Sequence, residues 1–192
     1  MNTDNWVNLK GKMAIPTLLR SGLTENIYEA TIEVKRGSGV SDFLIIRFNE
    51  ELFNPLPEEE ILVEIKGFLQ RCNYEGKTTI YVWAKDISPL EKPEYLNEVF
   101  IKGFICKKNE LRETPLTCNK IMELFVEVTP YKTYYLPLIA WNNVAYALSF
   151  FPLKTYISLK GRLQSRNYTK VFEDGTSIEK TAYEVSILTL YY

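Results

Sequence analysis

The side chains with the clearest chemistry in this sequence are aromatic rings and cations that lie close together in its second half. Arg166 and Tyr168 are two positions apart, so in a β-strand both would point to the same face. Arg162 and Gln164 extend this row at the same spacing. Unpaired bases stack on exposed aromatic rings, at about 1–3 kcal/mol per base, while a positively charged groove holds the phosphates. The row therefore predicts a surface that binds single-stranded nucleic acid.

The rest of the candidate surface consists of tyrosines, a tryptophan and basic residues of the same half. Tyr135 and Tyr168 are expected to be exposed. Trp141 is expected either to stack on bases or to pack in the core, because residues 137–140 before it are apolar. Isolated lysines are ordinarily solvated, and here their significance comes from their concentration. The candidate nucleic-acid-binding residues are Tyr131, Tyr134, Tyr135, Trp141, Tyr168, Lys107, Lys108, Arg112, Lys132, Arg162, Arg166 and Lys170.

Candidates for catalysis are scarce. The chain has no histidine, which excludes histidine-based acid–base and triad chemistry. It also has no glycine-rich nucleotide-binding pattern. Glu58, Glu59 and Glu60 follow two prolines in a polar stretch and are expected to form a solvated loop. We therefore predict that the protein is not an enzyme and that it has no cofactor, metal or small-molecule substrate.

The cysteines and the hydropathy pattern bear on the compartment. Cys72, Cys106 and Cys118 are scattered and have no CxxC spacing, which is typical of a reducing cytoplasm. No run of about 18 apolar residues predicts a membrane span. Residues 1–12 are polar and lack the pattern of a secretory signal. We predict a cytoplasmic, nucleoid-associated protein.

The sequence contains an internal repeat. Residues 65–74 (IKGFLQRCNY) and 159–168 (LKGRLQSRNY) share six of ten positions at a separation of 94 residues. Further blocks follow in the same order, among them 7–12 and 99–104. Repeats of this kind indicate a duplicated structural unit. The predicted segments are domain 1 over 1–90, a linker over 91–96 and domain 2 over 97–192.

Both halves have the pattern of a small β-barrel. Apolar and polar residues alternate in 43–48 and 155–164, as in a half-buried strand. The glycine inside the repeated strand predicts a bulge or a sharp bend. A short helix is expected after the third strand, over 142–151 in the second half and shorter, within 49–60, in the first. This pattern predicts an all-β protein with two tandem oligonucleotide-binding (OB) folds, each a five-stranded Greek-key barrel.

The second half resembles the bacterial single-stranded DNA-binding protein (SSB) family. Blocks 97–115, 135–145 and 159–187 are similar in type and order to the family's first strand, its third strand with the helix, and its last two strands. The first half resembles the family more weakly. The resemblance implies stacking roles for Tyr135, Trp141 and Tyr168, and a homodimer with four OB units. The sequence ends without the acidic C-terminal tail typical of the family, which favours a specialised role in competence, a mobile element or a phage.

The two halves differ in charge. Residues 1–94 contain 11 Lys/Arg and 15 Asp/Glu, a net charge of −4, whereas residues 95–192 contain 12 and 9, a net charge of +3. Because phosphate contacts drive polyanion binding, domain 2 is the expected main binder. Domain 1 is expected to be degenerate, with Asp42 aligned with Tyr135. Its candidate secondary contacts are Arg20, Lys35, Arg36 and Arg71, together with Phe48 and Tyr74, which are aligned with Trp141 and Tyr168.

The last hairpin of the second half is nine residues longer than that of the first and contains Asp174–Gly175, a strong turn signal. It is expected to project as a β-arm over a bound strand, or to be a loop without that role or a subunit contact. We predict sequence-tolerant single-stranded DNA binding in replication, recombination or repair. The alternatives are a primosome-like protein-interaction module with weak nucleic-acid binding, and RNA binding.

Overall fold

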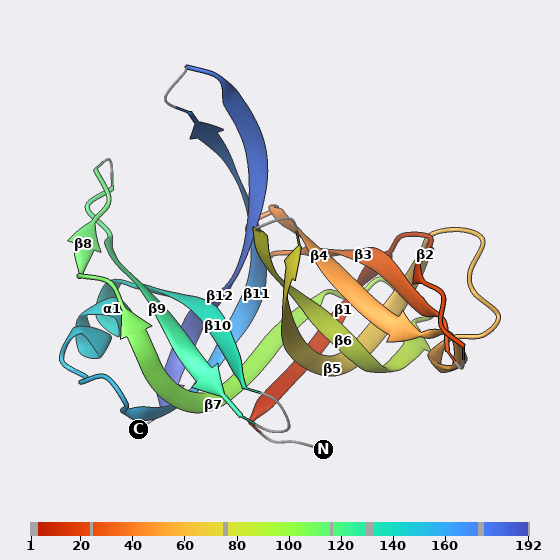
Figure 1. The fold of residues 1–192 in the computed structure, drawn as a ribbon, viewed down its shortest axis with the longest axis horizontal. Coiled ribbons are helices and arrows are strands. Elements are labelled where there is room, and N and C mark those ends of the chain that lie inside the picture. The colour runs from red at the N-terminus through yellow and green to blue at the C-terminus, as the bar shows by residue number, and fades with distance from the viewer. Residues whose placement is uncertain are drawn as a thin grey trace.

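The structure of the protein is a computed structural model, and it consists mainly of β-strands (Figure 1). The structure describes residues 4–23, 25–74, 77–115, 117–129, 133–172 and 175–191. In these ranges the strands are β1 (Asn5–Met13), β2 (Thr17–Arg20), β3 (Ile27–Lys35), β4 (Ser41–Asn49), β5 (Ile61–Tyr74), β6 (Lys77–Pro89), β7 (Leu96–Lys108), β8 (Arg112–Glu113), β9 (Lys120–Val128), β10 (Tyr134–Trp141), β11 (Tyr156–Val171) and β12 (Ser177–Tyr191). The helical elements are the 3-10 helix η1 (Glu50–Leu52) and the α-helix α1 (Asn142–Ser149).

The order of strands in the sheet is symmetric about its centre, with equivalent strands of the two repeats at equal distances from it. It runs β2-β3-β4-β6-β5-β1-β7-β11-β12-β10-β9-β8, so the halves join through antiparallel pairing of β1 with β7. At this junction Val7 lies opposite Val99. These two residues begin the matched blocks of the repeat, so a pseudo-twofold axis passes between them. We call the two sides of this junction the N-terminal and C-terminal barrels.

Each barrel closes in the same way. The first long strand of each barrel pairs with two neighbours at once, β1 with β5 and β3, and β7 with β11 and β9. The third long strand pairs in parallel with the last, β4 with β6 and β10 with β12. A helical element follows β4 and β10, although η1 has only three residues and α1 has eight. This is the two-OB architecture that the sequence predicts.

The repeated glycines mark the points where long strands bend. Pairing shifts register between Lys66 and Gly67 in β5, and between Lys160 and Gly161 in β11. A Cβ atom at Gly67 would overlap a backbone carbonyl oxygen of β6, and one at Gly161 would lie 2.6 Å from a carbonyl oxygen of β12. Only glycine permits this approach, because any side chain would push the strands apart. The predicted bulge is therefore confirmed in both copies.

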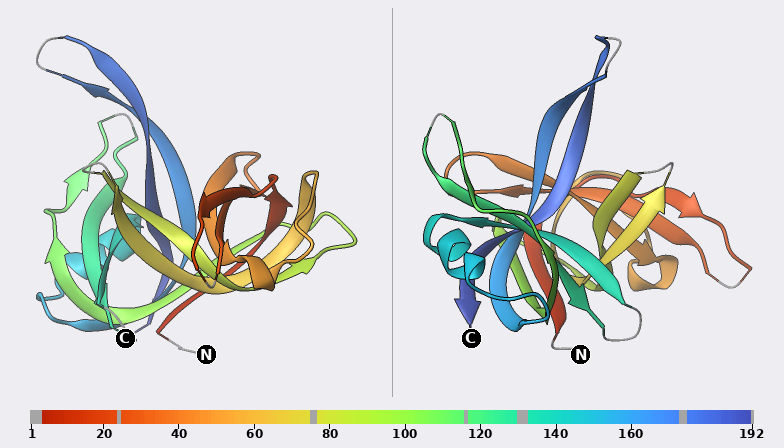
Figure 2. Two further views of the ribbon diagram at one scale, coloured as in Figure 1. Left: turned by 45° about the vertical axis from the view of Figure 1, so that its right-hand side comes forward. Right: turned by 60° about the vertical axis from the view of Figure 1, so that its left-hand side comes forward.

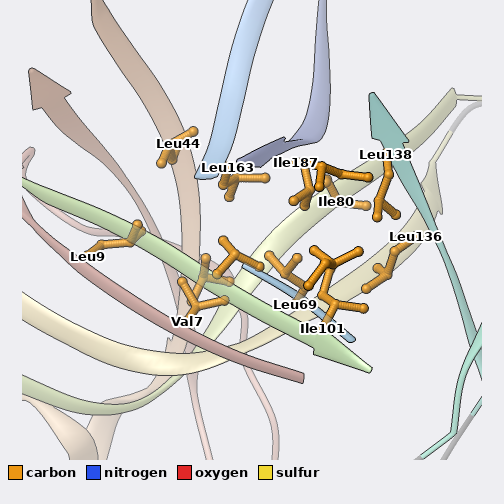
Figure 3. Packing of buried hydrophobic residues seen from close by; sticks show 14 of the residues in the cluster. Val7, Leu9, Leu44, Leu69, Ile80, Ile101, Leu136, Leu138, Leu163 and Ile187 are labelled. Carbon is orange, nitrogen blue, oxygen red and sulfur yellow. The ribbon is translucent and has the colours of Figure 1, made fainter. Parts of the chain in front are cut away.

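The hydrophobic core extends across the junction of the barrels. Alternate residues of β3 and β4 are buried, as the period of two requires. Leu69 and Ile80 of the N-terminal barrel lie among Leu136, Leu138 and Ile187 of the C-terminal barrel (Figure 3). The barrels therefore share apolar packing as well as the β1–β7 pairing. That residues 1–90 and 97–192 are independent domains remains a prediction.

The β11–β12 hairpin extends beyond its barrel as a long ribbon. Pairing continues from Ser158 opposite Tyr191 to Val171 opposite Ser177. The distal part of this ribbon, from the Arg166–Ala182 pair to the Val171–Ser177 pair, is called the arm. The end of the ribbon stands away from the rest of the molecule in all three views (Figures 1 and 2). The predicted hairpin thus projects as an arm. In the part of the chain that the structure describes, no helix has the length and apolar character needed to cross a membrane.

Candidate nucleic-acid interface

The basic and aromatic row of β11 lies on one face of the arm. Arg166 pairs across the ribbon with Ala182, and Tyr168 with Lys180. The Arg166 guanidinium lies 5.8 Å from the centre of the Tyr168 ring, and its Nε lies 3.6 Å from a carboxylate oxygen of Glu184. Tyr168 is 39% exposed. The spacing of two thus places an accessible ring beside an accessible cation, as the sequence predicts.

A groove of about 550 Å³ opens beside this face and is walled by both barrels. We call it the arm groove. Tyr168 and the β12 segment 179–184 form one side, and Phe125 of β9 and Pro137 of β10 form another. Arg71, from β5 of the N-terminal barrel, also lines the groove, and its Nη1 donates a hydrogen bond to the backbone carbonyl of Tyr135 at 3.4 Å. Aromatic, apolar and cationic groups therefore converge on one concavity.

Strand β10 sends its residues alternately inward and outward. Leu136 and Leu138 are buried, while Tyr135 lies on the other face and is 43% exposed. Trp141 is half-buried on that same outward side, where β10 ends and α1 begins. Tyr134 points to the inward side and packs against the core, where burial raises the pKa of its phenol. Tyr135 is thus the more accessible ring of this strand, while a binding role for the half-buried Tyr134 stays a prediction.

Lys108 was predicted to contact phosphate, and the structure gives it a different role. Its Nζ donates hydrogen bonds to the backbone carbonyls of Leu148, Ser149 and Phe151, at 3.3, 2.8 and 2.6 Å. The carbonyls of Leu148 and Ser149 belong to the last turn of α1 and that of Phe151 follows the helix, at the end where the helix dipole is negative. The Leu148 carbonyl also accepts a hydrogen bond from the backbone N–H of Phe151 at 3.2 Å. An ammonium group has three donors, and all three are engaged here. Lys108 is therefore a helix cap.

Arg162 was also predicted to contact phosphate, but it is half-buried at the base of the arm. Its Nε is buried and has no hydrogen-bond partner among the described residues. Burial and the nearby charge of Arg36 lower the pKa of the Arg162 guanidinium. The row that begins at Arg162 therefore becomes accessible only at Arg166, because the first part of β11 belongs to the barrel and the second part to the arm.

A polar contact between β4 and β11 holds the base of the arm. The Asp42 carboxylate is fully buried and accepts hydrogen bonds from Arg36, with Nε to Oδ2 at 2.7 Å. The same carboxylate accepts a hydrogen bond from the backbone N–H of Ser165 at 3.1 Å, and Phe43 N–H donates to Ser165 Oγ at 3.0 Å. We call these residues the clasp. Because Asp42 raises the pKa of Arg36 and neutralises its charge, the predicted phosphate contact by Arg36 is corrected.

The remaining cations of the C-terminal barrel differ in availability. Arg112 Nη2 forms an ion pair with Glu123 at 2.9 Å in an exposed position on β8. Lys107 is exposed, with its Nζ 6.0 Å from the centre of the Phe125 ring that lines the arm groove. Lys107 therefore places an exposed cation near a ring of the groove, whereas the charge of Arg112 is balanced by Glu123.

The pairing of strands corrects the alignment of the two barrels. Tyr135 lies opposite Glu127 on β9, and Phe43 lies opposite Glu33 on β3. Glu33 and Glu127 occupy equivalent positions of the two barrels, because they pair with equivalent residues of β1 and β7. Phe43, and not Asp42, is thus the counterpart of Tyr135. The same register makes Asn49 the counterpart of Trp141 and turns Phe48 into the core, where it is fully buried. A slip of one residue exchanges the faces of a strand, so the predicted stacking role of Phe48 is wrong.

Several predicted residues fall outside this description or apart from the groove. Tyr131 and Lys132 lie outside the described residues. Tyr74 is the last residue of β5, and Lys170 is the next-to-last residue of β11. Only the backbone of these two residues is described. Arg20 is exposed on β2, at the outer edge of the sheet. Within the described ranges, no group of three or more Cys, Asp or Glu side chains could hold a metal ion.

Sequence reasoning missed two aromatic contributors to the surface, and the contact made by a third contributor, Arg71. Phe125 was not among the candidates, yet it is half-buried and lines the arm groove. Phe43 was aligned one position away, although its exposed side of β4 follows from the alternation of that strand. Arg71 was expected as a possible phosphate contact, but its approach to Tyr135 depends on how the barrels dock. Only the first two had a signal in the sequence.

Comparisons with known proteins agree with this architecture. Neither a protein-family model nor a curated protein sequence matches the chain. Among solved structures, the wild-type single-stranded DNA binding protein from Thermus aquaticus matches with a TM-score of 0.78 and 24% identity, covering 97% of this chain and 91% of that chain. A deletion mutant of that protein matches with a TM-score of 0.77 and 23% identity, covering 97% and 93%. The chain therefore has the two-OB fold of this bacterial single-stranded DNA-binding protein along nearly its whole length.

Proposed function

We propose that this protein binds single-stranded DNA with little sequence preference, mainly on its C-terminal barrel. The observation that carries the proposal is the arm groove, where the rings of Tyr168 and Phe125 meet Arg71 in one open concavity. Stacking on a ring tolerates every base, because every base has a π-face. The function of the similar Thermus aquaticus protein, as its name states it, agrees with this proposal.

The charges around the groove define how binding would work. Arg166 is accessible but lies near Glu184, and Glu179 also lines the groove. A phosphate must therefore compete with carboxylates for the nearby cations. Such binding depends strongly on salt, since cations that contact phosphates release condensed counterions from the strand. We expect moderate affinity at low salt and a steep fall as salt rises.

Fluorescence anisotropy of a labelled oligo-dT of about 30 nucleotides tests the proposal, measured from about 50 to 200 mM salt. We expect saturable binding that weakens with salt, and similar affinities for mixed sequences of equal length. An oligo-rU competitor decides between DNA and RNA. Absence of binding at the lowest salt would reject the proposal.

We further propose that two chains associate, which would bring four OB units together. The support is the resemblance to the SSB family, together with an aromatic pair on the outer side of the central β1–β7 junction. Trp6 and Phe100 pair there with ring centroids 5.6 Å apart, and both are half-buried in the single chain. Native mass measurement with and without oligo-dT reports the number of chains directly, and a monomer in both conditions would reject the dimer.

A second role for the N-terminal barrel is favoured by how its cations are paired. Arg36 is bound to Asp42, and Arg47 is bound to Glu29 at 2.7 Å while it covers the ring of Tyr81. The charges of these two arginines are thus balanced by carboxylates, which supports an assembly module for protein partners. Its test is retention of a replication partner by the full chain when the DNA-binding surface is inactivated by Tyr135→Ala with Tyr168→Ala.

A further inference from the structure

The arm has a second hollow on the face opposite to the arm groove. Its volume is about 350 Å³, and it lies where β4 of the N-terminal barrel approaches the ribbon. We call it the clasp hollow, because the clasp forms one end of it. The residues that line it are Ser41, Phe43, Ser165, Asn167, Thr181 and Tyr183.

The two hollows adjoin each other at β12. Arg166 and Tyr168 belong to the face of β11 that is turned toward the arm groove, and Asn167 between them belongs to the opposite face. Thr181 and Tyr183 are in the walls of both hollows. A strand lying in the arm groove could therefore continue past β12 into the clasp hollow without leaving the protein surface.

Phe43 gives the clasp hollow an exposed aromatic ring. Its side chain is 53% exposed, more than that of Tyr135, whose pseudo-symmetric position it occupies. Its backbone is fixed by the hydrogen bond from its N–H to Ser165 Oγ. An exposed ring on a fixed strand meets the requirement for base stacking, since little conformational freedom is lost when a base binds.

The rest of the lining is polar and suits the edge of a base. Thr181 Oγ1 donates a hydrogen bond to Asn167 Oδ1 at 2.8 Å, which orients the Asn167 amide. Amide and hydroxyl groups can bond the edges of a splayed-out base. The clasp hollow therefore combines a ring for stacking with hydrogen-bond donors and acceptors. Its lining differs in this way from that of an apolar packing defect.

We propose that the clasp hollow is a second base-binding subsite, in which Phe43 stacks on a base of a single strand that also occupies the arm groove. This inference rests on the proposed function. It makes the N-terminal barrel a direct contributor to DNA binding, through a residue that the sequence alignment had placed out of register. The bound strand passes around the base of the arm, from the C-terminal to the N-terminal barrel.

The charges near Phe43 define what kind of contribution this subsite makes. Arg36 is neutralised by the buried carboxylate of Asp42, and the Ser41 hydroxyl donates to Glu33 at 2.7 Å. No cation lines this hollow among the described residues. The subsite therefore adds stacking without phosphate contacts, and its loss leaves the salt dependence of binding unchanged.

The test compares Phe43→Ala with Tyr156→Ala in the full chain. Tyr156 is an aromatic control of nearly equal exposure, at 52%, at the opposite end of β11 from the arm. Affinity is measured for oligo-dT of about 30 nucleotides and for the shortest oligo-dT that the wild-type chain binds. We expect Phe43→Ala to weaken binding of the long oligonucleotide by roughly 5- to 100-fold, with little change for the short one and the same salt slope. Phe43→Trp retains a ring and should restore long-oligonucleotide affinity.

The outcomes separate this inference from the function on which it rests. If the wild-type chain binds neither oligonucleotide, the proposed function fails and the subsite fails with it. If the wild-type chain binds both and Phe43→Ala behaves like Tyr156→Ala, only the subsite is rejected. A reduced salt slope in Phe43→Ala, or no recovery in Phe43→Trp, would also overturn it, because both would indicate a change other than lost stacking. Thermal unfolding of each variant verifies that the fold is intact.

Discussion

The two barrels have the same arrangement of strands but different surfaces. Position 166 of the C-terminal barrel is an arginine whose side chain is 54% exposed, while the matching position of the N-terminal barrel is Cys72, within 3.5 Å of Arg47 Nη1. Arg47 itself is only 19% exposed, because Glu29 and the ring of Tyr81 enclose it. The strand arrangement thus determines the position of a side chain. The residues around that side chain determine whether its charge or ring is available to a ligand.

A second contrast lies in the parts that follow the third long strand. The C-terminal barrel has an eight-residue helix, capped by Lys108, whereas the N-terminal barrel has a single 3-10 turn. The arm likewise extends only from the C-terminal barrel in Figure 1. Elements added at the ends of strands therefore distinguish the barrels, while the strands and their glycines are kept. The predictions below test this contrast, from the largest expected effect to the smallest.

Removal of both accessible tyrosines of the C-terminal barrel should have the largest effect. We expect Tyr135→Ala with Tyr168→Ala to weaken oligo-dT binding by about 2–6 kcal/mol, since each ring is worth about 1–3 kcal/mol and the two lie on different strands. Anisotropy titration measures the loss. The pair Tyr135→Phe with Tyr168→Phe keeps both rings and serves as the control. A loss no greater than that of Phe43→Ala would remove the distinction between the barrels.

Substitution of the bend glycines should destabilise both barrels, and the N-terminal one more. Gly67→Ala and Gly161→Ala each force a Cβ against a backbone carbonyl oxygen, and the overlap is closer at Gly67. We expect a loss of about 1–3 kcal/mol in the free energy of unfolding, with Gly67→Ala at the upper end. Urea unfolding followed by circular dichroism measures both. The exposed glycine Gly37, whose added Cβ would touch nothing within 4 Å, provides the control Gly37→Ala.

Loss of the Lys108 ammonium should affect stability and not DNA affinity. Lys108→Met keeps the length of the side chain but removes the hydrogen bonds that Lys108 donates to three carbonyls near the end of α1. We expect a loss of about 1 kcal/mol in the free energy of unfolding. Oligo-dT affinity should stay within a factor of about two. Weaker binding with unchanged stability would instead assign Lys108 to phosphate contact.

Neutralisation of Arg166 should give the smallest change and the most specific one. Arg166→Gln is expected to reduce the slope of log affinity against log salt by about one, because one phosphate contact is lost. Arg36→Gln should leave that slope unchanged, since Asp42 already neutralises this cation. Titrations at four or more salt concentrations, about 50 to 200 mM, give both slopes. Equal slopes for the two variants would show that pairing with Asp42 does not decide availability.

Much of the fold was predictable from the sequence because it depends on local pattern and on the repeat. The alternation of apolar and polar residues identifies the strands, and the glycine of the repeated segment predicts the bends at Gly67 and Gly161. The dipeptide Asp174–Gly175 predicts the turn of the long hairpin. The site was predicted less completely. Arg166, Tyr168 and Tyr135 are accessible as expected, but Phe48 is buried, because alignment without strand pairing left the register uncertain by one residue.

The sequence alone determines which side chains alternate, where the chain bends and which half carries net positive charge, because these properties depend on residue type and spacing along the chain. Only the tertiary structure decides which cations remain accessible and which are consumed by internal contacts. Lys108 caps a helix some forty residues away, and Asp42 holds both Arg36 and the base of the arm at Ser165. Such contacts join residues that are distant in the chain, so they depend on how the strands pair and how the two barrels pack together.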